Sequence, residues 1–279
     1  MGEPFIGSEA VAMGLVTKSA LRRHYTRLYR DVYIEPGIVL TAERKAHAAW
    51  LWSRRNAVVA GFSAAALHGS RWVNASRPAE LLHDNRHRLP ELRIWGDRLD
   101  DDERQLIAGV PVTTPARTAL DLACWYPRGT AVAAIDALAR AVDLKMADVD
   151  LLTERYRGRR GIGQAIATLS LIDSGAQSPK ESWLRTVLVE AGLPRPTTQI
   201  PVYDDDCRPF AFLDMGWEDV MVAVEYDGEQ HRIDRKQYTW DIRRQERIER
   251  CGWLVVRVVA DDREADIIRR VRAARSRRT

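Results

Sequence analysis

Alternating hydrophobic and polar positions in the last quarter of the chain predict a β-hairpin. In the segment DMGWEDVMVAVEYDGEQH, residues 214–231, Val220, Val222 and Val224 fall on one face of a strand. The segment PFAFLD before it predicts a second strand, and the residues GWED supply the turn between the two. We therefore expect an antiparallel strand pair at the centre of a C-terminal domain.

Helical periods of hydrophobic residues surround this hairpin. ESWLRTVLVEAG comes before a strand QIPVYD, and TWDIRRQERIERCG follows the hairpin, ahead of a strand WLVVRVV and a basic closing helix. The polar stretch SGAQSP separates this part from the rest. Residues 177–279 are thus predicted to form an α/β/α domain in the order helix, three mainly antiparallel strands, helix, strand, helix. The end of the closing helix, RRVRAARSRRT, is expected to fray.

The first forty residues carry shorter elements. Ser8 is expected to cap a helix SEAVAMG, and Thr17 to cap a second helix KSALRRHY. The arm TRLYRDVYIEPG then alternates and stops at a Pro-Gly pair. Two helices followed by a short strand pair are the layout of a winged helix-turn-helix, so residues 1–40 are predicted to form a DNA-binding domain of that class.

Residues 41–176 mix strand and helix periods and are predicted to form an α+β middle region. Thr41 is expected to cap the helix AERKAHAAWLWSRR, and a short strand and helix follow in AVVAGFSAAALHG. Strands are predicted in RPAELLHD, ELRIWGDRL and GVPVTT. Helices are predicted in PARTALDLACWY, TAVAAIDALARAV, ADVDLLTERY and QAIATLSLIDSG. The whole chain is therefore of the α/β class, and its middle region has no role that the pattern reveals.

Composition narrows the functions that this architecture serves. A chain of 279 residues holds two or three cores, and Lys and Arg exceed Asp and Glu by 43 to 39, which favours an anionic partner. Cys124, Cys207 and Cys251 are scattered without a CxxC pair, so neither a disulfide framework nor a zinc cluster is indicated. There is no signal-peptide pattern and no apolar run of membrane-spanning length, so we expect a cytoplasmic protein with no membrane contact.

Arginines on the predicted winged helix are candidate DNA contacts. Arg22, Arg23 and Arg27 fall on or just after the second helix, which would be the recognition helix, and Arg30 falls in the wing. Such side chains bind backbone phosphates and steer the domain onto DNA. The alternative is a solvated basic face on a small helical cap.

Three carboxylates are predicted to meet at one end of the hairpin. Glu225 and Asp227 lie two apart and share a face of one strand, and Asp214 lies on the strand beside it. Like charges at such spacing repel unless a cation neutralises them, and hard oxygen ligands suit Mg²⁺ or Mn²⁺. We therefore expect a metal site formed by these three residues. The alternative is that they are ordinary solvated acids at a strand end.

Two stretches of the first half resemble a known family. The segment GLVTKSALRRHYTRLYRDVYIEPG resembles the N-terminal domain of AbiEi-type antitoxins, which are DNA-binding autorepressors of type IV toxin–antitoxin systems. The stretch from GFSAAALHG to TTPARTALDLA resembles the region that accompanies that domain. The resemblance implies DNA binding by the N-terminal segment.

The last hundred residues resemble a different family. ESWLRTVLVEAGL, FLDMGW, VEYDGEQH and WDIRRQERIERCGWLVVRV are similar, in that order, to the Vsr-like branch of the PD-(D/E)xK, restriction-endonuclease-like nucleases. The resemblance implies metal-dependent cleavage of DNA. It assigns catalytic positions to Asp214, Glu225, Glu181, His231 and Asp241.

Two departures from that family's pattern bear on activity. Asp227 stands where the motif has a lysine, which leaves His231 as the candidate for relaying protons, as in Vsr endonucleases; the zinc site of Vsr proper is missing. Glu181 also has a simpler interpretation, because Ser178, Pro179 and Glu181 form the N-cap, N1 and N3 positions of a capping box.

The nuclease hypothesis gives each group a role. A Mg²⁺ held by Asp214 and Glu225, with Asp227 as a third ligand, would activate a water for attack on the scissile phosphate. Arginines on the following helix would hold backbone phosphates, namely Arg243, Arg244 and Arg247. The alternative for these arginines is an Arg/Glu ladder on a solvated helix face.

Two functions remain open from the sequence. The first is a divalent-metal-dependent DNA endonuclease, acting on single- or double-stranded DNA, with the winged helix docking DNA; RNA is an alternative substrate because the site chemistry is the same. The second is a non-enzymatic, antitoxin-like transcriptional repressor with a degenerate nuclease domain. A regulatory protein is a further candidate partner in either case.

Overall fold

The computed structural model describes residues 2–84, 89–204, 206–227 and 235–278, with the backbone alone at residues 235–239 and 241. The chain divides into two compact units, Met1–Ser170 and Leu171–Thr279. Among the helices of the described segments, none combines the length and apolar character that a membrane crossing requires. Each unit has its own sheets and core, and we describe them in turn.

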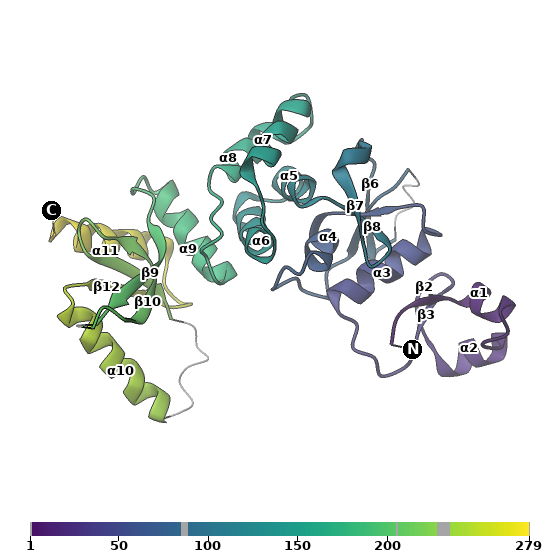
Figure 1. Cartoon of the computed structure of the whole chain (residues 1–279), viewed down its shortest axis with the longest axis horizontal. Helices are drawn as coiled ribbons and strands as arrows, with labels where there is room; N and C mark the ends of the chain where they lie inside the picture. Colours follow the sequence, from purple (N-terminus) through teal and green to yellow (C-terminus); the bar gives the residue numbers. More distant parts are fainter. Residues whose placement is uncertain (1, 85–88, 205, 228–234, 279) are drawn as a thin grey trace. The chain divides into compact units, whose positions relative to one another are not determined.

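The first unit begins with a small three-stranded sheet and two short helices (Figure 1). In chain order the elements are β1 Phe5–Ile6, α1 Gly7–Ala12, α2 Lys18–His24, β2 Thr26–Tyr29 and β3 Val32–Ile34. The antiparallel sheet has the order β1-β3-β2. The predicted sequence of two helices and a strand pair is confirmed, and β1 adds a strand too short for its pattern to show.

Caps decide where these first helices begin. The Thr17 hydroxyl accepts a hydrogen bond from the Ala20 N–H at 3.0 Å, as expected for the cap of α2. The expected cap by Ser8 is wrong, because α1 begins one residue earlier with Ile6 as N-cap. The Ser8 hydroxyl instead donates to Asp31 Oδ2 at 2.6 Å, across the β2–β3 turn.

A five-stranded mixed sheet forms the rest of the first unit, with the order β6-β5-β4-β8-β7. Its strands are β4 Val58–Val59, β5 Ala79–Leu82, β6 Leu92–Trp95, β7 Arg104–Ile107 and β8 Val110–Thr113. The helices are α3 Ala42–Trp52, α4 Gly61–Leu67, α5 Pro115–Trp125, α6 Arg128–Ala141, α7 Met146–Arg155 and α8 Ile162–Leu169, with a 3₁₀ turn η1 Asp101–Glu103. One apolar cluster joins this sheet to the N-terminal one through α3, so Ala46 and Ala49 pack between Ile6 and Leu81. The predicted elements are confirmed, and β7 is additional.

A buried network of charges lies beneath α5. Arg117 is fully buried and donates to Asp121 Oδ1 at 2.8 Å, to the Arg98 carbonyl at 2.8 Å and to Glu103. Arg159 donates to the same Asp121 oxygen at 2.7 Å. Burial raises the pKa of Asp121, and the two guanidinium groups oppose that rise. These charges compensate one another and fix α5 against η1 and the segment after α7.

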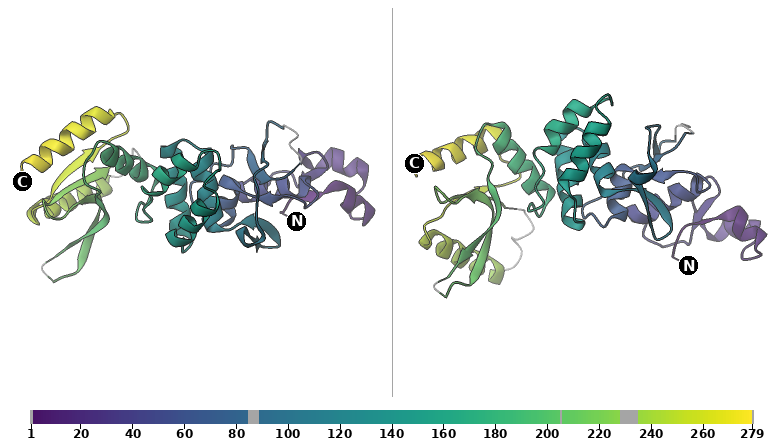
Figure 2. Two further views of the ribbon diagram at one scale, coloured as in Figure 1. Left: turned by 90° about the horizontal axis from the view of Figure 1, so that it is seen from above. Right: turned by 45° about the horizontal axis from the view of Figure 1, so that its top comes forward.

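The second unit is a four-stranded sheet covered by helices on both faces (Figure 2). Its elements are α9 Pro179–Glu190, β9 Thr197–Tyr203, β10 Pro209–Trp217, β11 Val222–Tyr226, α10 Arg235–Arg250, β12 Leu254–Val258 and α11 Glu264–Ser276. The sheet order is β12-β11-β10-β9; β9, β10 and β11 are antiparallel neighbours, and β12 runs parallel to β11. The predicted order of elements is confirmed.

Two apolar clusters hold these layers together. Leu184 of α9 and Val271 of α11 pack with Met215 on one face of the sheet. Ile248 of α10 packs with Leu213 on the other face. The expected fraying of the arginine-rich tail is wrong, because α11 continues to Ser276 and residues spaced as one helix face, Ile267, Val271 and Ala274, are buried.

Candidate functional site

The strand register brings Asp214 and Glu225 together. Trp217 pairs with Val222 and Met215 with Val224, and Asp214 and Glu225 are the residues next to this last pair of the β10–β11 ladder. Asp214 Oδ2 accepts a hydrogen bond from the Tyr226 N–H at 2.8 Å. The hairpin expected from the sequence therefore places these two acids side by side.

The backbone is irregular at this position. Residues two apart on a regular strand share a face. Leu213, however, packs under α10, and Met215 packs under α9 and α11 on the other face. On the neighbouring strand, Gln199 lies opposite Asp214 by register and has a left-handed φ of 53°. A left-handed non-glycine residue costs free energy, and such strain gathers at functional sites. The side chain of Asp214 thus leaves β10 where the strand changes face.

Glu181 joins the two acids from the first turn of α9. The Ser178 hydroxyl accepts from the Glu181 N–H at 3.2 Å, which confirms the predicted N-cap. The Glu181 carboxylate, nearly buried, accepts from the Gln177 N–H at 2.8 Å and from Gln199 Nε2 at 3.3 Å. Glu181 therefore binds a backbone N–H ahead of its helix, as a capping acid does, although at Gln177 rather than at the N-cap.

Burial and like charge act together on Asp214. Burial, followed by the negative charge of Glu181 and then that of Glu225, raises the pKa of Asp214 to about 7. The Tyr226 N–H and the Arg244 guanidinium oppose it only in part. We call Glu181, Asp214 and Glu225 the acid cluster. Its negative charge is not fully compensated by the side chains that surround it.

Arg244 is the cation nearest to this cluster. Its Nη2 donates to Glu225 Oε1 at 2.9 Å and to the Phe212 carbonyl at 2.8 Å. The arginine predicted to hold a DNA phosphate is thus engaged within the protein. Arg247 lies with its guanidinium carbon 4.0 Å from the Phe210 ring centroid, and Arg243 is exposed. The pair between Arg244 and Glu225 was not predictable from the sequence, because it links a helix to a strand nineteen residues away.

Asp227 is the remaining predicted acid whose side chain the structure describes. Asp227 is half-buried, and its N–H donates to the Val258 carbonyl at 2.8 Å. Among the described residues, ligand atoms of three acidic side chains lie within 4.8 Å of one another at Asp100, Asp102 and Glu103, and neither at Asp214, Glu225 and Asp227 nor within the acid cluster. The acids of that other group are paired with Arg155, Arg98 and Arg117. His231 and the side chain of Asp241 lie outside the described residues.

The first unit presents a separate basic surface. Arg22 and Arg23 end α2, Arg27 lies on β2, and Arg30 lies in the β2–β3 turn; all four are exposed. No hydrogen bond or ion pair engages these four side chains within the described part of the chain. The acids of this region are used elsewhere: Asp31 pairs with Arg54 at 2.8 Å and Glu9 with Arg55 at 2.6 Å. We call the four arginines the α2 basic face.

Comparison with known proteins finds a family match in the middle of the chain. Residues 57–174 match the family model of the AbiEi antitoxin C-terminal domain. The chain is also 31% identical over 158 residues to two proteins of Mycobacterium tuberculosis, Uncharacterized protein MT2308 of strain CDC 1551 / Oshkosh and Uncharacterized protein Rv2248 of strain ATCC 25618 / H37Rv. That similarity covers 57% of this chain and 58% of each relative, so the chain spans less than two thirds of their length. No solved structure matches the chain significantly.

The family match bears out one part of the sequence analysis. The resemblance of the region from GFSAAALHG onward to antitoxins is confirmed over residues 57–174. The match begins after the α2 basic face and ends before the acid cluster. The winged helix-turn-helix and the Vsr-like nuclease domain therefore stay predictions.

Proposed function

We propose that this protein is a DNA-binding regulator of the antitoxin type. The observation that carries the proposal is the match of residues 57–174 to an antitoxin domain, in a chain whose first forty residues carry two short helices with an unpaired basic face. Antitoxin resemblance alone does not say which surface meets DNA. The α2 basic face supplies that surface.

The geometry of the first forty residues suits docking on a duplex. The two helices α1 and α2 are joined by a short turn, and Gly7 lets α1 approach Leu21 of α2 and Tyr33 of β3 closely. A helix of this kind enters the major groove, and the arginines at its end and in the wing reach phosphates on either side. Because these guanidinium groups have no acidic partner among the residues that the structure describes, no ion pair of that part of the chain has to break when DNA binds.

A binding experiment tests this proposal. A labelled duplex from the region upstream of the protein's own coding sequence is titrated with full-length protein, and an unrelated duplex serves as competitor. We expect Arg22→Ala/Arg23→Ala to weaken binding by at least about tenfold, which corresponds to two lost phosphate contacts. Arg160→Ala, an exposed arginine outside the α2 basic face, is the matched control. Equal affinity of the double variant and the wild type would overturn the proposal.

We also propose a second function, metal-dependent cleavage of nucleic acid at the acid cluster. The uncompensated charge of Glu181, Asp214 and Glu225, with the raised pKa of Asp214, favours it. Carboxylate oxygens are the ligands that Mg²⁺ prefers, so the donor set fits a divalent cation. Asp214 and Glu225 would hold that cation once Arg244 releases Glu225, and Glu181 would complete the negative charge around it.

In that function the cation, when bound, would polarise a phosphate and lower the pKa of a water. The protein itself would hold the acidic side chains in position. The Tyr226 N–H fixes one carboxylate oxygen of Asp214, and Gln177 and Gln199 fix Glu181. These hydrogen bonds would hold Asp214 and Glu181 in place, whereas Glu225 would have to leave Arg244 before it met a cation.

Cleavage assays separate the two functions. Labelled single- and double-stranded DNA, and RNA, are incubated with full-length protein and Mg²⁺, Mn²⁺ or EDTA. Metal-dependent cutting that is lost in Asp214→Ala and Glu225→Ala, and retained in Glu246→Ala, supports the nuclease. If wild-type protein binds DNA but cuts none of these substrates, the nuclease proposal is wrong and the regulator stands.

A further inference from the structure

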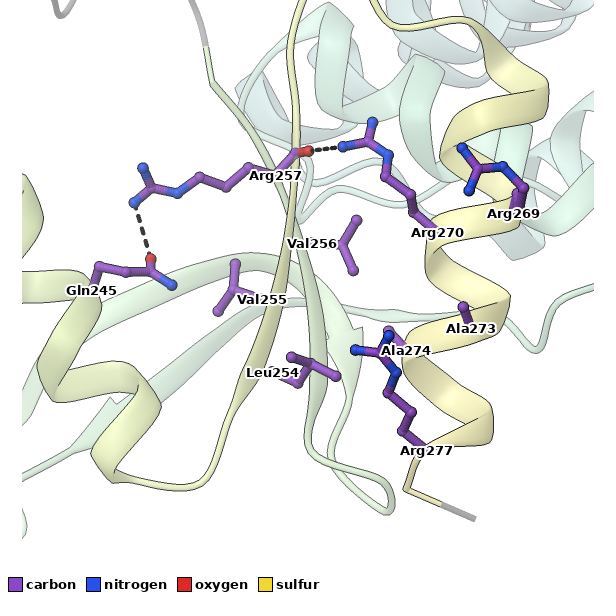
Figure 3. Close-up of a pocket in the computed structure, with 10 residues that line it drawn as sticks. All are labelled: Gln245, Leu254, Val255, Val256, Arg257, Arg269, Arg270, Ala273, Ala274 and Arg277. Carbon is purple, nitrogen blue, oxygen red and sulfur yellow. Dashed lines mark hydrogen bonds between the residues drawn. The ribbon is translucent and has the colours of Figure 1, made fainter.

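The second unit has a groove along the free edge of its sheet. β12 is the last strand in the order β12-β11-β10-β9, and a cavity of about 600 Å³ lies beside it, bounded by α10 and α11. Leu254, Val255 and Val256 form its floor, and Arg257, Arg270 and Arg277 stand around it (Figure 3). All of these residues belong to one unit.

The backbone of β12 has hydrogen-bonding groups that face this groove. The Leu254 N–H donates to the Met221 carbonyl at 2.9 Å, and Val258 accepts from Asp227, so the even-numbered residues face β11. The odd-numbered residues Val255 and Arg257 therefore point their N–H and C=O groups away from the sheet. The Arg257 carbonyl accepts from Arg270 Nη1 at 2.8 Å, which shows this orientation directly.

The charges around the groove are of one sign. Arg257 donates to Gln245 of α10 at 2.9 Å. Neither Arg257 nor Arg277 of α11 has an acidic partner in the described residues. Arg269 and Arg270 are paired with Asp266 and Asp262. No acidic side chain lines the cavity among the described residues. The groove thus offers two cations without acidic partners among the described residues, above an apolar floor and beside a strand edge.

We propose that this groove binds an extended, acidic segment of a partner protein, which adds to the sheet as a fifth strand beside β12. Strand addition uses the outward N–H and C=O groups of Val255 and Arg257, and alternate side chains of the segment meet α10 and α11. Acidic side chains on the two faces of the bound segment pair with Arg257 and Arg277. As the segment pairs, Arg270 leaves the Arg257 carbonyl.

Other occupants fit less well. A second copy of this chain, paired edge to edge, would set arginines against arginines. A nucleic acid would satisfy the arginines but would leave the strand's N–H groups and the apolar floor without partners. The unpaired edge and the free charges together select a peptide.

A peptide of alternating Glu and Val, about six residues long like a typical strand, tests the proposal. It is labelled with fluorescein and titrated with full-length protein by fluorescence anisotropy. We expect saturable binding, weakened by about tenfold in Arg257→Glu and in Arg277→Glu. Arg250→Glu makes the same charge change at an exposed position of α10, outside the groove, and should bind as wild type does.

A modified peptide tests strand pairing without any change to the protein. The same sequence, methylated on alternate backbone nitrogens, keeps every charge and side chain but cannot pair as a strand. We expect it to bind at least about tenfold more weakly, and a Lys–Val peptide to show no binding. Equal affinity of the methylated peptide would overturn strand addition. Displacement of the Glu–Val peptide by a single-stranded oligonucleotide, or a dimer that Arg257→Glu dissociates, would assign the groove to nucleic acid or to a second copy.

Discussion

Asp214 is the residue whose ionisation reports on the acid cluster. Its ordinary pKa is 3.8, and in the folded protein it rises to about 7 because the side chain is buried beside Glu181 and Glu225. Between those two values the folded chain keeps a proton that the unfolded chain has lost. The free energy of unfolding therefore falls as the pH rises from about 4 to about 7, and stays low above that.

Asp214→Asn should remove this pH dependence. The amide cannot ionise, so we expect the variant to be more stable than the wild type at pH 8, by about 4 kcal/mol, and equal to it near pH 4. Thermal unfolding of both proteins at a series of pH values measures the difference. Glu246→Gln, an exposed acid on α10, is the control and should show no such trend. A constant difference between Asp214→Asn and wild type across this pH range would contradict the assigned pKa.

Gly61 is a second residue at which local geometry makes a sharp prediction. It has a φ of +53°, and a Cβ there would collide with the Glu80 carboxylate, which the Phe62 N–H holds at 2.6 Å. Gly109, with a φ of +81°, has nothing within 4 Å of an added Cβ. We expect Gly109→Ala to cost about 1–2 kcal/mol and Gly61→Ala to cost distinctly more. Urea unfolding midpoints compare the two, and equal costs would show that Glu80 is free to move.

At the scale of elements, the buried network of Arg117 holds α5 in place. Removing one partner of a buried ion pair leaves the others uncompensated, so Arg117→Met should cost about 3–5 kcal/mol of unfolding free energy. Arg104 pairs with the exposed Asp101, and Arg104→Met should cost under about 1 kcal/mol. Chemical denaturation of the two variants measures this contrast. A loss at Arg117 no larger than that at Arg104 would mean that the network contributes little.

Elements were predictable where their signals are local. Thr17 and Ser178 begin helices because a hydroxyl two or three residues ahead of a hydrophobic period fits an N-cap, and the structure has both. The pairing of Glu181 with Gln199 was not predictable, because it depends on the register of β9 and on a left-handed φ that sequence does not report. For the same reason the sequence pointed to Asp227, two residues from Glu225, as the third member of the site, whereas the charge of Glu181 on Asp214 became visible only in the structure. The metal ligands themselves stay predictions.

At the scale of the whole molecule, two kinds of charged surface belong to two units. The first unit carries arginines without acidic partners at the α2 basic face, beside a region that matches an antitoxin domain. The second carries acids whose charge is only partly compensated. The order of elements in both units could be predicted from hydrophobic periods. The non-local parallel pairing of β4 with β8, across some fifty residues, could not.

The salt dependence of DNA affinity tests the central claim most directly. Each arginine that neutralises a phosphate adds about 0.9 to the slope of log affinity against log salt concentration. The regulator account predicts a steep slope for the wild type and a slope smaller by about 2 for Arg22→Ala/Arg23→Ala. Arg160→Ala should keep the wild-type slope. A double variant with an unchanged slope would show that DNA does not meet the α2 basic face.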